Sequence, residues 1–404
     1  MVCILRSYVM LSKKLLVICG AYAVDPLVMQ SFNPLVPSIK TAFSVDITLV
    51  ALSTAFHMLP LSVLCLFSGT ISDLYSRPKI LMYGLFIYSF GLMLGSISPN
   101  ITIFLLTRII DGVGAALIQP ICVALIGDIT PEHEVGKAIG FSGMFLAFVG
   151  MTLGPLISGF LGEINWRIVP LYICVYSLII GVFSMIVFRG FITPVENTRN
   201  VSVVFQKIRS AVGNRNLLLL APVGFISMFA WSAVQPLISD SLSLPPLLLK
   251  KSEIGTIFSI VGFVGVFFAY IGGVLTDKLG AKRSILFALL MEAIPLFLLI
   301  FANSYWSFSI LLAINGAFNR VSQTSRSTLA VELTPEARGS ASSVIQFAQF
   351  LGYSSSPIII PLLYLSSGID YVFLLSSSLM LLSIVFIASI HLNKLTPKAR
   401  VKET

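Results

Sequence analysis

The sequence GTISDLYSRPK at residues 69–79 has a counterpart, GVLTDKLGAKR, at residues 273–283. Both stretches begin with glycine, carry an aspartate four positions later and end in basic residues, and Asp73 and Asp277 are 204 residues apart. Other landmarks recur at the same offset: Gly112 as Gly316, Gln119 as Gln323 and Asp128 as Glu332. Several landmarks at one spacing predict two copies of one structural unit.

The composition places both copies in a lipid bilayer. Of 404 residues, 56% are hydrophobic and 11% charged, and the mean hydropathy is +0.96, which leaves too little polar surface to coat a soluble protein. Runs of about 20 apolar residues can span the hydrocarbon core. Twelve such runs are predicted at 15–37, 48–72, 80–98, 101–125, 137–162, 167–190, 216–240, 254–276, 284–302, 306–331, 339–365 and 370–392.

The predicted fold is therefore an all-α integral membrane protein with twelve transmembrane helices in two pseudo-symmetric six-helix bundles. Prolines within the runs, among them Pro26, Pro34, Pro120 and Pro155, are expected to leave the spans unbroken, because neighbouring helices can satisfy the freed backbone groups.

The distribution of Lys and Arg predicts the orientation, since positively charged loops stay in the cytoplasm. With the N-terminus inside, nineteen Lys and Arg residues fall in cytoplasmic segments and four on the other side. Both termini are thus expected in the cytoplasm. The net charge of +9 is then an orientation signal, and nucleic-acid binding is not expected.

A polar stretch at residues 191–215 separates the two repeats and predicts the domain organisation: a bundle at 1–190, a linker, and a bundle at 216–404 with a short basic tail. Apolar residues recur in the linker at helical spacing: Val201, Val204, Phe205, Ile208 and Val212. This pattern suits a short helix on the anionic inner leaflet. A partly ordered loop is the alternative.

Ionisable side chains inside the spans are the candidates for function, because charge at membrane depth is costly and tends to face a wet interior. They are Asp25, His57, Arg108, Asp111, Glu292, Arg320 and Arg326. Asp25 is the best candidate for a proton carrier, because burial disfavours its charged form. The equivalent position in the second repeat is near Ser227, so the acid is specific to the first. A structural Asp25, hydrogen-bonded to nearby backbone, is the alternative.

The fourth and tenth spans each carry a polar face. Positions spaced as on one side of a helix are Arg108, Asp111, Gly112, Ala115 and Gln119 in the fourth span and Leu312, Asn315, Gly316, Asn319 and Gln323 in the tenth. Two such faces directed inward would form the walls of a central aqueous path. Alternatively, these small and polar residues only hold helices together.

The repeated loop motif resembles the signature of the major facilitator superfamily, and the resemblance covers essentially the whole chain. Ser76 stands where a second glycine is usual. The resemblance implies a latch on the cytoplasmic face that bridges helix ends, formed by Gly69, Asp73, Arg77 and Lys79 and by Gly273, Asp277, Gly280 and Arg283.

Further motifs imply the subclass. The fourth span resembles the proton-coupling motif of this superfamily, with Asp111 in place of the commoner glutamine; the motif lies on Arg108, Gly112, Gly114, Ala115 and Ala116. In the first span, Asp25 with Pro34 nine residues later is similar to a pattern of multidrug exporters. The expected proton-coupling residues are Asp25, Arg108 and Asp111. Residues 150–159, GMTLGPLISG, are similar to the antiporter motif of drug:proton exporters. The matching positions are Gly150, Gly154, Pro155 and Gly159. Small residues there permit close helix approach, and Pro155 is expected to kink the span.

The resemblance implies a proton-coupled exporter of small amphipathic compounds, working by alternating access as a monomer in the inner (plasma) membrane. The expected cavity residues are Asn33, His57, Gln119, Phe229, Trp231, Gln235, Asn315, Asn319, Arg320 and Gln323. The alternatives are a uniporter, or a proton symporter of a small metabolite or an organic anion drawn to Arg320 and Arg326, and a transporter-like receptor. No enzyme motif, ATP-binding loop or metal-ligand cluster is found in the sequence, so no cofactor or metal is expected.

Overall fold

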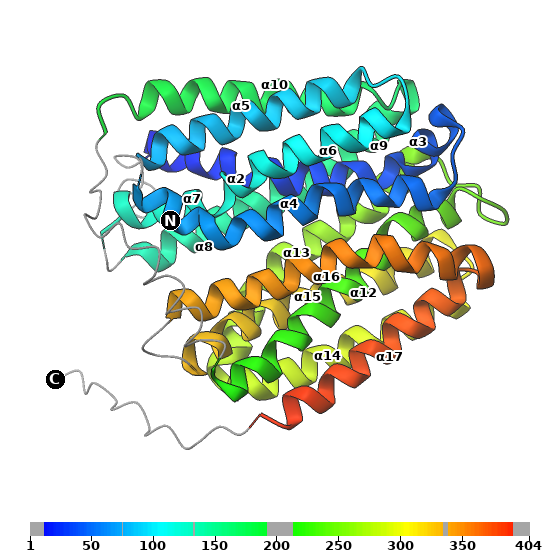
Figure 1. The fold of residues 1–404 in the computed structure, drawn as a ribbon. Coiled ribbons are helices and arrows are strands. Elements are labelled where there is room, and N and C mark those ends of the chain that lie inside the picture. The colour runs from blue at the N-terminus through cyan, green and yellow to red at the C-terminus, as the bar shows by residue number, and fades with distance from the viewer. Residues whose placement is uncertain (1–11, 75, 132–133, 192–212, 334–337, 391–404) are drawn as a thin grey trace, which may run out of the picture.

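The computed structural model describes residues 12–74, 76–131, 134–191, 213–333 and 338–390, and within them the side chains of all residues except 12, 66–74 and 338–343. All regular secondary structure in these ranges is helical (Figure 1). Ten helical segments of the described chain are long and apolar enough to cross a membrane. The two other predicted spans correspond to α15 and α16, whose sequences are richer in Asn, Gln and Ser. The predicted all-helical membrane fold is confirmed.

The described residues of the first half form eleven helical elements. They are α2 Ser12–Phe32, η1 Asn33–Leu35, α3 Val36–Phe43, α4 Ile47–Leu74, α5 Arg77–Ser96, α6 Ile101–Ala116, α7 Gln119–Ile129, α8 Val135–Leu146, η3 Ala147–Leu153 and α9 Gly154–Ile164, followed by α10 Ile168–Val187. The second half contributes α12 Arg215–Leu242, α13 Lys251–Leu279, α14 Ala281–Leu298, η4 Leu299–Phe301, α15 Tyr305–Leu333, α16 Arg338–Ser367 and α17 Ile369–Ala388.

The two halves repeat one packing scheme. In the first half α4 and α5 both pack on α6, and in the second half α13 and α14 both pack on α15. The halves lie side by side (Figure 1) and meet where α4 packs on α16 and α9 packs on α13. The predicted linker at 191–215, with its expected amphipathic helix, lies almost entirely outside the described residues.

Three spans of the first half are interrupted beside a proline, so the expectation of unbroken helices is wrong there. Pro34 lies in the 3-10 turn η1. Pro120 opens α7 just after the break that ends α6, and Pro155 opens α9 just after the π-helical turn η3. Proline lacks the N–H that would bond to the preceding turn, and its ring crowds that turn. Pro26, in contrast, lies inside the continuous helix α2.

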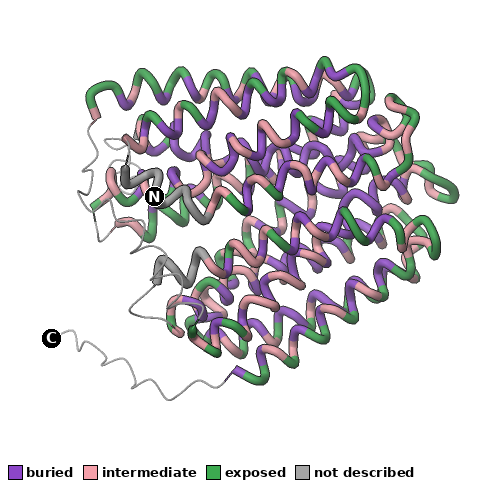
Figure 2. The backbone as a smooth tube through the Cα atoms, viewed as in Figure 1, coloured by how far each residue is buried: buried purple, intermediate pink, exposed green. Residues whose placement is uncertain are grey.

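The exposed surface is apolar along the sides of the molecule. On α10, for example, Leu171 and Phe183 are exposed whereas Ser177 and Ser184 are buried. Figure 2 shows the same arrangement throughout, with exposed residues on the outer helix faces and buried residues between helices. This pattern suits a protein surrounded by lipid.

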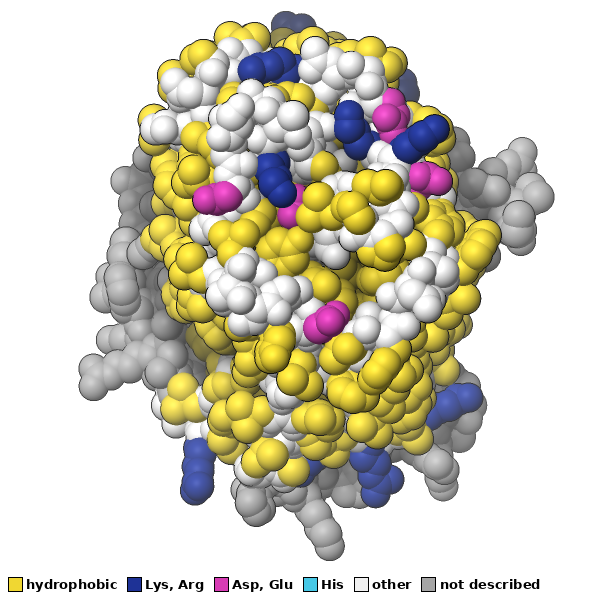
Figure 3. Space-filling view, turned by 90° about the vertical axis from the view of Figure 1, so that its right-hand side faces the viewer, with side chains coloured by type: hydrophobic (Ala, Val, Ile, Leu, Met, Phe, Trp, Pro, Cys, Tyr) yellow, Lys and Arg dark blue, Asp and Glu magenta, His cyan; other side chains and the backbone are white. Residues whose placement is uncertain are grey.

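Basic side chains gather at one end of the molecule. We call the end where α10 ends and α12 begins the linker end. Among described residues it carries Lys13, Lys14, Arg77, Lys79, Lys137, Arg189, Arg215, Lys278, Lys282 and Arg283. The opposite end (Figure 3) carries Lys40, Arg167, Lys250 and Lys251 together with acidic side chains.

Candidate functional site

A cavity of about 560 Å³ lies between the two halves. Its walls come from both halves, chiefly α2, α8, η3, α12, α13, α15 and α16, with single residues from α4 and α7. Four of its lining residues, Ile139, Gly143, Ser327 and Gln346, are exposed. Ile139 and Gly143 lie in the first half of the span Val135–Ile164, and all four lie in the part of their span nearer the linker end. The cavity therefore opens toward the linker end.

Polar contacts join the two halves at the opposite end. Asn33 Nδ2 donates to Gln235 Oε1 at 2.8 Å. Lys40 Nζ lies 2.8 Å from Asp240 Oδ1, and Tyr364 donates its hydroxyl to Asp240 Oδ2 at 3.1 Å. Asp240 is buried, so its charge depends on these two partners. Together these contacts close the cavity on that side.

The predicted antiporter motif lies where α9 and η3 touch both halves. A Cβ atom on Gly150 would come within 2.7 Å of the Pro26 side chain on α2. A Cβ on Gly159 would come within 2.7 Å of the Lys251 carbonyl oxygen on α13. Gly154 and Pro155 are buried between these points. The glycines thus permit close backbone approach within the first half and across to the second.

Asp25 brings a carboxylate to the cavity wall. It is a lining residue, although only 3% of its surface is exposed. Gln119 Nε2 donates to its Oδ2 at 2.6 Å, and Tyr88 donates its hydroxyl to Oδ1 at 3.2 Å. The break between α6 and α7 places Gln119 at the first position of α7. Asp25 is therefore held from α5 and α7 while still facing the cavity.

Behind Asp25, His57 connects the cavity acid to a second one. His57 Nε2 lies 2.7 Å from Asp25 Oδ1, and Nδ1 lies 2.7 Å from Asp111 Oδ1. Arg108 Nη1 donates to Asp111 Oδ2 at 2.5 Å, and the Arg108 guanidinium also lies over the ring of Phe32. These four ionisable groups, which we call the His57 cluster (Asp25, His57, Asp111 and Arg108), are all buried.

The cluster does not form a metal site. The two nitrogens of His57 face different carboxylates, so the three side chains do not converge on one point. Within the described ranges, no group of three or more His, Cys, Asp or Glu side chains could hold a metal ion.

The predicted cavity residues divide into two groups. Five of them line the cavity: Gln119, Trp231, Asn319, Arg320 and Gln323. The other five are not among its lining residues: His57, Asn33, Gln235, Phe229 and Asn315. His57 lies behind Asp25, and Asn33 and Gln235 form part of the closure. Phe229 stacks on Phe225 along α12, and Asn315 donates to the backbone oxygen of Glu292 at 2.9 Å. The five predicted cavity residues of this second group therefore lie outside the cavity wall in this structure.

Two of the other ionisable residues in the spans lie together in the second half. Glu292 and Arg326 are fully buried and do not line the cavity. Asn319 Nδ2 donates to Glu292 Oε2 at 3.0 Å, so a cavity residue connects with this acid. Arg320, in contrast, faces the cavity, where its Nη1 donates to Gln323 Oε1 at 2.8 Å. Of the two arginines proposed to attract an anion, Arg320 is the one at the wall.

The predicted latch lies at the linker end and is described in part. Gly69 and Asp73 lie in the last turns of α4, outside the described side chains. Arg77 Nη1 donates to Asp128 Oδ1 at 2.5 Å and joins the start of α5 to the end of α7. Four latch residues, Lys79, Asp277, Gly280 and Arg283, are exposed, and Gly273 is half-buried. Gly280 has a φ of 82° and connects α13 to α14. Its positive φ favours glycine.

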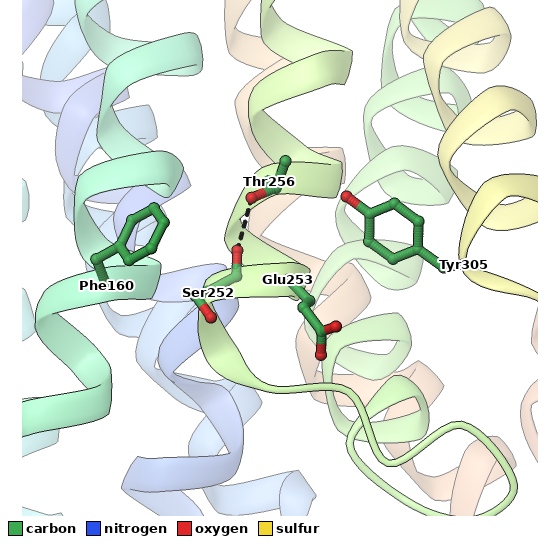
Figure 4. A pocket seen from close by; sticks show the side chains of 5 residues that line it. All are labelled: Phe160, Ser252, Glu253, Thr256 and Tyr305. Carbon is green, nitrogen blue, oxygen red and sulfur yellow. Dashed lines mark hydrogen bonds between the residues drawn. The ribbon is translucent and has the colours of Figure 1, made fainter.

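A smaller cavity of about 280 Å³ lies at the opposite end and is lined by Phe160, Ser252, Glu253, Thr256 and Tyr305 (Figure 4). Its polar groups have partners at the start of α13 and on α9. Glu253 accepts from the Lys250 backbone N–H at 2.8 Å, Thr256 donates to the Ser252 carbonyl at 2.8 Å, and Ser252 donates its hydroxyl to Glu163 Oε1 at 3.2 Å. The central cavity, with Asp25 and Arg320 in its wall, is the stronger candidate for a substrate site.

Several lining residues were not predicted from the sequence. They include Tyr22, Gln30, Met151, Gln346, Gln349 and Tyr353. Tyr88, which contacts Asp25 from behind, was also missed. The repeat offset could have found it, because Tyr88 is the equivalent of Glu292 in the second half.

Comparison with known proteins places the chain in a family. The sequence profile described as Major Facilitator Superfamily matches residues 18–247 and 220–404. The chain belongs to this superfamily. It is therefore a multi-pass membrane protein. Among curated proteins it is similar to the quinolone resistance protein NorA of Staphylococcus aureus, at 26% identity over 254 residues, which are 61% of this chain and 62% of that protein.

Other members of the superfamily match as well. The uncharacterized MFS-type transporter YhcA of Bacillus subtilis is 27% identical over 234 residues, 57% of this chain and 40% of that protein. For NorA of Staphylococcus aureus, the match spans about 62% of the relative's own length. Among solved structures, the D-xylose-proton symporter superposes with a TM-score of 0.75 at 16% identity and covers 95% of this chain and 98% of that one. At this identity the likeness shows the fold alone.

Proposed function

We propose that this transporter is a proton-coupled exporter of small amphipathic compounds, similar to the drug:proton antiporters. The observation that carries the proposal is Asp25, a buried carboxylate that lines the cavity and contacts a histidine at 2.7 Å on its other side. A group in this place can meet a substrate and exchange a proton with the His57 cluster. Protonation would then change the relative stability of two arrangements of the halves.

The cavity wall supports an amphipathic substrate. Trp231, Met29 and Phe350 supply apolar surface, whereas Gln119 and Gln323 supply amide groups. Apolar lining with a few polar groups is typical of small-molecule sites. The similarity to a quinolone resistance protein makes a fluoroquinolone a suitable first compound.

The direction of transport rests on the positions of the basic residues. Because positively charged loops stay inside, we propose that the linker end and both termini are cytoplasmic and that the protein works as a monomer in the plasma membrane. The opening of the cavity then faces the cytoplasm. Alternating access would carry a compound from there to the outside, with residues 1–190 and 216–404 rocking as units.

Purified protein in liposomes tests the proposal. A compound panel that includes a fluoroquinolone is added outside, and a dye reports the internal pH. Antiport predicts that the lumen becomes alkaline as the compound enters, because protons leave in exchange. Asp25→Asn should abolish this change, whereas Asp370→Asn, at an exposed acid of the opposite end, should retain it. Normal exchange in Asp25→Asn would refute the role of this acid.

A proton symporter of an organic anion is the second candidate, favoured by Arg320 in the cavity wall. The same liposomes separate the two candidates, because symport would acidify the lumen. Entry of labelled compound with no pH change would indicate a uniporter.

A further inference from the structure

His57 is held between two carboxylates in a way that fixes the number of protons in the cluster. Its Nε2 and Nδ1 lie 2.7 Å from Asp25 and Asp111 oxygens respectively. A neutral imidazole carries one N–H and one bare nitrogen, and an ionised carboxylate only accepts. Two short contacts of this kind therefore need one proton more than a neutral histidine between two ionised acids provides.

The other contacts indicate which group holds that proton. Asp25 accepts from Gln119 on one oxygen and from Tyr88 on the other. Asp111 accepts from Arg108 on the oxygen that does not face His57. Each carboxylate therefore has a hydrogen-bond donor or a ring nitrogen at both of its oxygens, and an ionised carboxylate, which only accepts, matches this arrangement. The extra proton then belongs on the ring, which becomes an imidazolium that donates to both acids.

The charges within the cluster then cancel. Asp25 and Asp111 each contribute one negative charge, and Arg108 and the imidazolium each contribute one positive charge. The groups that face the ring are Asp25 on α2, Asp111 on α6 and Tyr88 on α5, and Tyr88 adds no charge. A compensated buried cluster is far less costly than one with an unpaired charge.

We propose that His57 carries the exchanged proton, and that the arrangement open to the linker end is its proton-loaded state. This inference rests on the proposed proton coupling and adds the residue that stores the proton. Asp25, which faces both the ring and the cavity, is the group through which the proton leaves.

Loss of the proton should release Asp25 and keep Asp111 in place. The backbone of His57 is pressed against α6, where a Cβ on Gly112 would lie 2.3 Å from the His57 carbonyl oxygen. The backbone of Asp111 is pressed against α5, where a Cβ on Gly91 would lie 2.8 Å from the Asp111 nitrogen. These backbone contacts hold α4, α5 and α6 together at the depth of His57. The contact that can open is therefore the one between His57 and Asp25 on α2. Asp25 then becomes free to bind a substrate.

Nitrogen-15 NMR of the histidine rings tests the location of the proton without transport. The chain has three histidines, so the double variant His133→Gln/His391→Gln leaves His57 as the one labelled ring. The expected spectrum at about pH 6 has both ring nitrogens protonated. A spectrum with one protonated and one bare nitrogen would place the proton on a carboxylate and overturn the proposal.

Transport by His57→Gln provides the second test. The glutamine side chain can donate a hydrogen bond to one acid, but it does not gain or lose a proton as histidine does. We expect compound binding, followed by the fluorescence of Trp231 in the cavity wall, to remain, whereas compound-driven pH change falls to the level of protein-free liposomes. The His133→Gln/His391→Gln protein is the matched control and should retain both. Exchange at the wild-type rate in a folded His57→Gln protein would overturn the inference and leave proton coupling standing. Absence of any pH change with wild-type protein would refute the proposed function, and the NMR spectrum would still decide the protonation of His57.

Discussion

At the residue scale, the Arg108–Asp111 pair determines whether the His57 cluster can exist. Both side chains are almost fully buried, with exposed fractions of 3% and 1%. Removing one member of a buried pair leaves an uncompensated charge, which costs about 3–5 kcal/mol. The pair is therefore needed for stability as well as for any role in coupling.

Arg108→Met tests this dependence. We expect a loss of stability of about 3–5 kcal/mol, measured as a lower melting temperature and a lower denaturation midpoint in detergent. The double variant Arg108→Met/Asp111→Asn should recover part of the loss, because the stranded charge is removed. Arg189→Met, at an exposed arginine of the linker end, serves as control. Equal losses in Arg108→Met and Arg189→Met would contradict the expectation.

Residue types at membrane depth identified part of this site from the sequence. Asp25, Arg108 and Asp111 attract attention because charge in a span is costly. The bridging place of His57 could not be predicted, because it depends on α2, α4 and α6 meeting at one level. A single histidine in an apolar run carries no information about that meeting.

At the element scale, close packing between helices depends on particular glycines. Gly112 allows α6 to touch the backbone of α4 at His57, and a methyl group there would meet a carbonyl oxygen that cannot move aside. Gly127, in the next helix α7, has nothing within 4 Å of its would-be Cβ. A substitution at Gly127 can therefore serve as the control for the same substitution at Gly112.

Gly112→Ala should separate α4 from α6 and destabilise the protein by about 1–3 kcal/mol, the usual cost of overpacking. Gly127→Ala should be neutral or stabilising, since alanine is the better helix former. Thermal unfolding in detergent compares them directly. A Gly112→Ala protein as stable as Gly127→Ala would show that the contact is looser than described.

The positions of the helices were predictable from the sequence, but their interruptions were not. Apolar length and the repeat offset locate the spans. Whether a proline interrupts its span depends on what neighbouring helices offer to the freed backbone groups. Pro26 stays inside α2, whereas Pro155 follows the π-helical turn η3, and the sequence around each gave no sign of the difference.

At the scale of the whole molecule, the contacts at the opposite end hold the two halves together there. The Lys40–Asp240 bridge with Tyr364 joins α3 of the first half to α12 and α16 of the second. A hydrogen bond to a charged group contributes about 1.5–3 kcal/mol. This energy favours the arrangement in which the cavity opens toward the linker end.

Lys40→Ala should shift the population toward opening at the opposite end. Spin labels at Ile164 and Trp306, both exposed there and one in each half, would report a larger share of long distances by double electron–electron resonance. Lys250→Ala, at an exposed lysine on the same face, should leave the distances unchanged. A distribution for Lys40→Ala identical to that of wild type would show that this bridge does not set the balance.

The sequence repeat predicted the fold of the whole molecule, because helices 204 residues apart in the sequence pack in the same way in both halves. Which end of the cavity is open could not be predicted. That choice depends on contacts such as Asn33 with Gln235, between positions about half the chain apart, and on small free-energy differences between two arrangements of the same helices.

The charge count of the His57 cluster has an electrical consequence. With its proton the cluster is neutral, so its movement relative to the membrane field does no work. Without the proton it carries one negative charge, and each elementary charge moved through the full field exchanges about 2.3 kcal/mol per 100 mV. In the proposed export cycle, a negative cell interior would drive the carrier outward when it has lost its proton and holds a neutral compound. The voltage across the membrane would then contribute to the step in which the compound leaves.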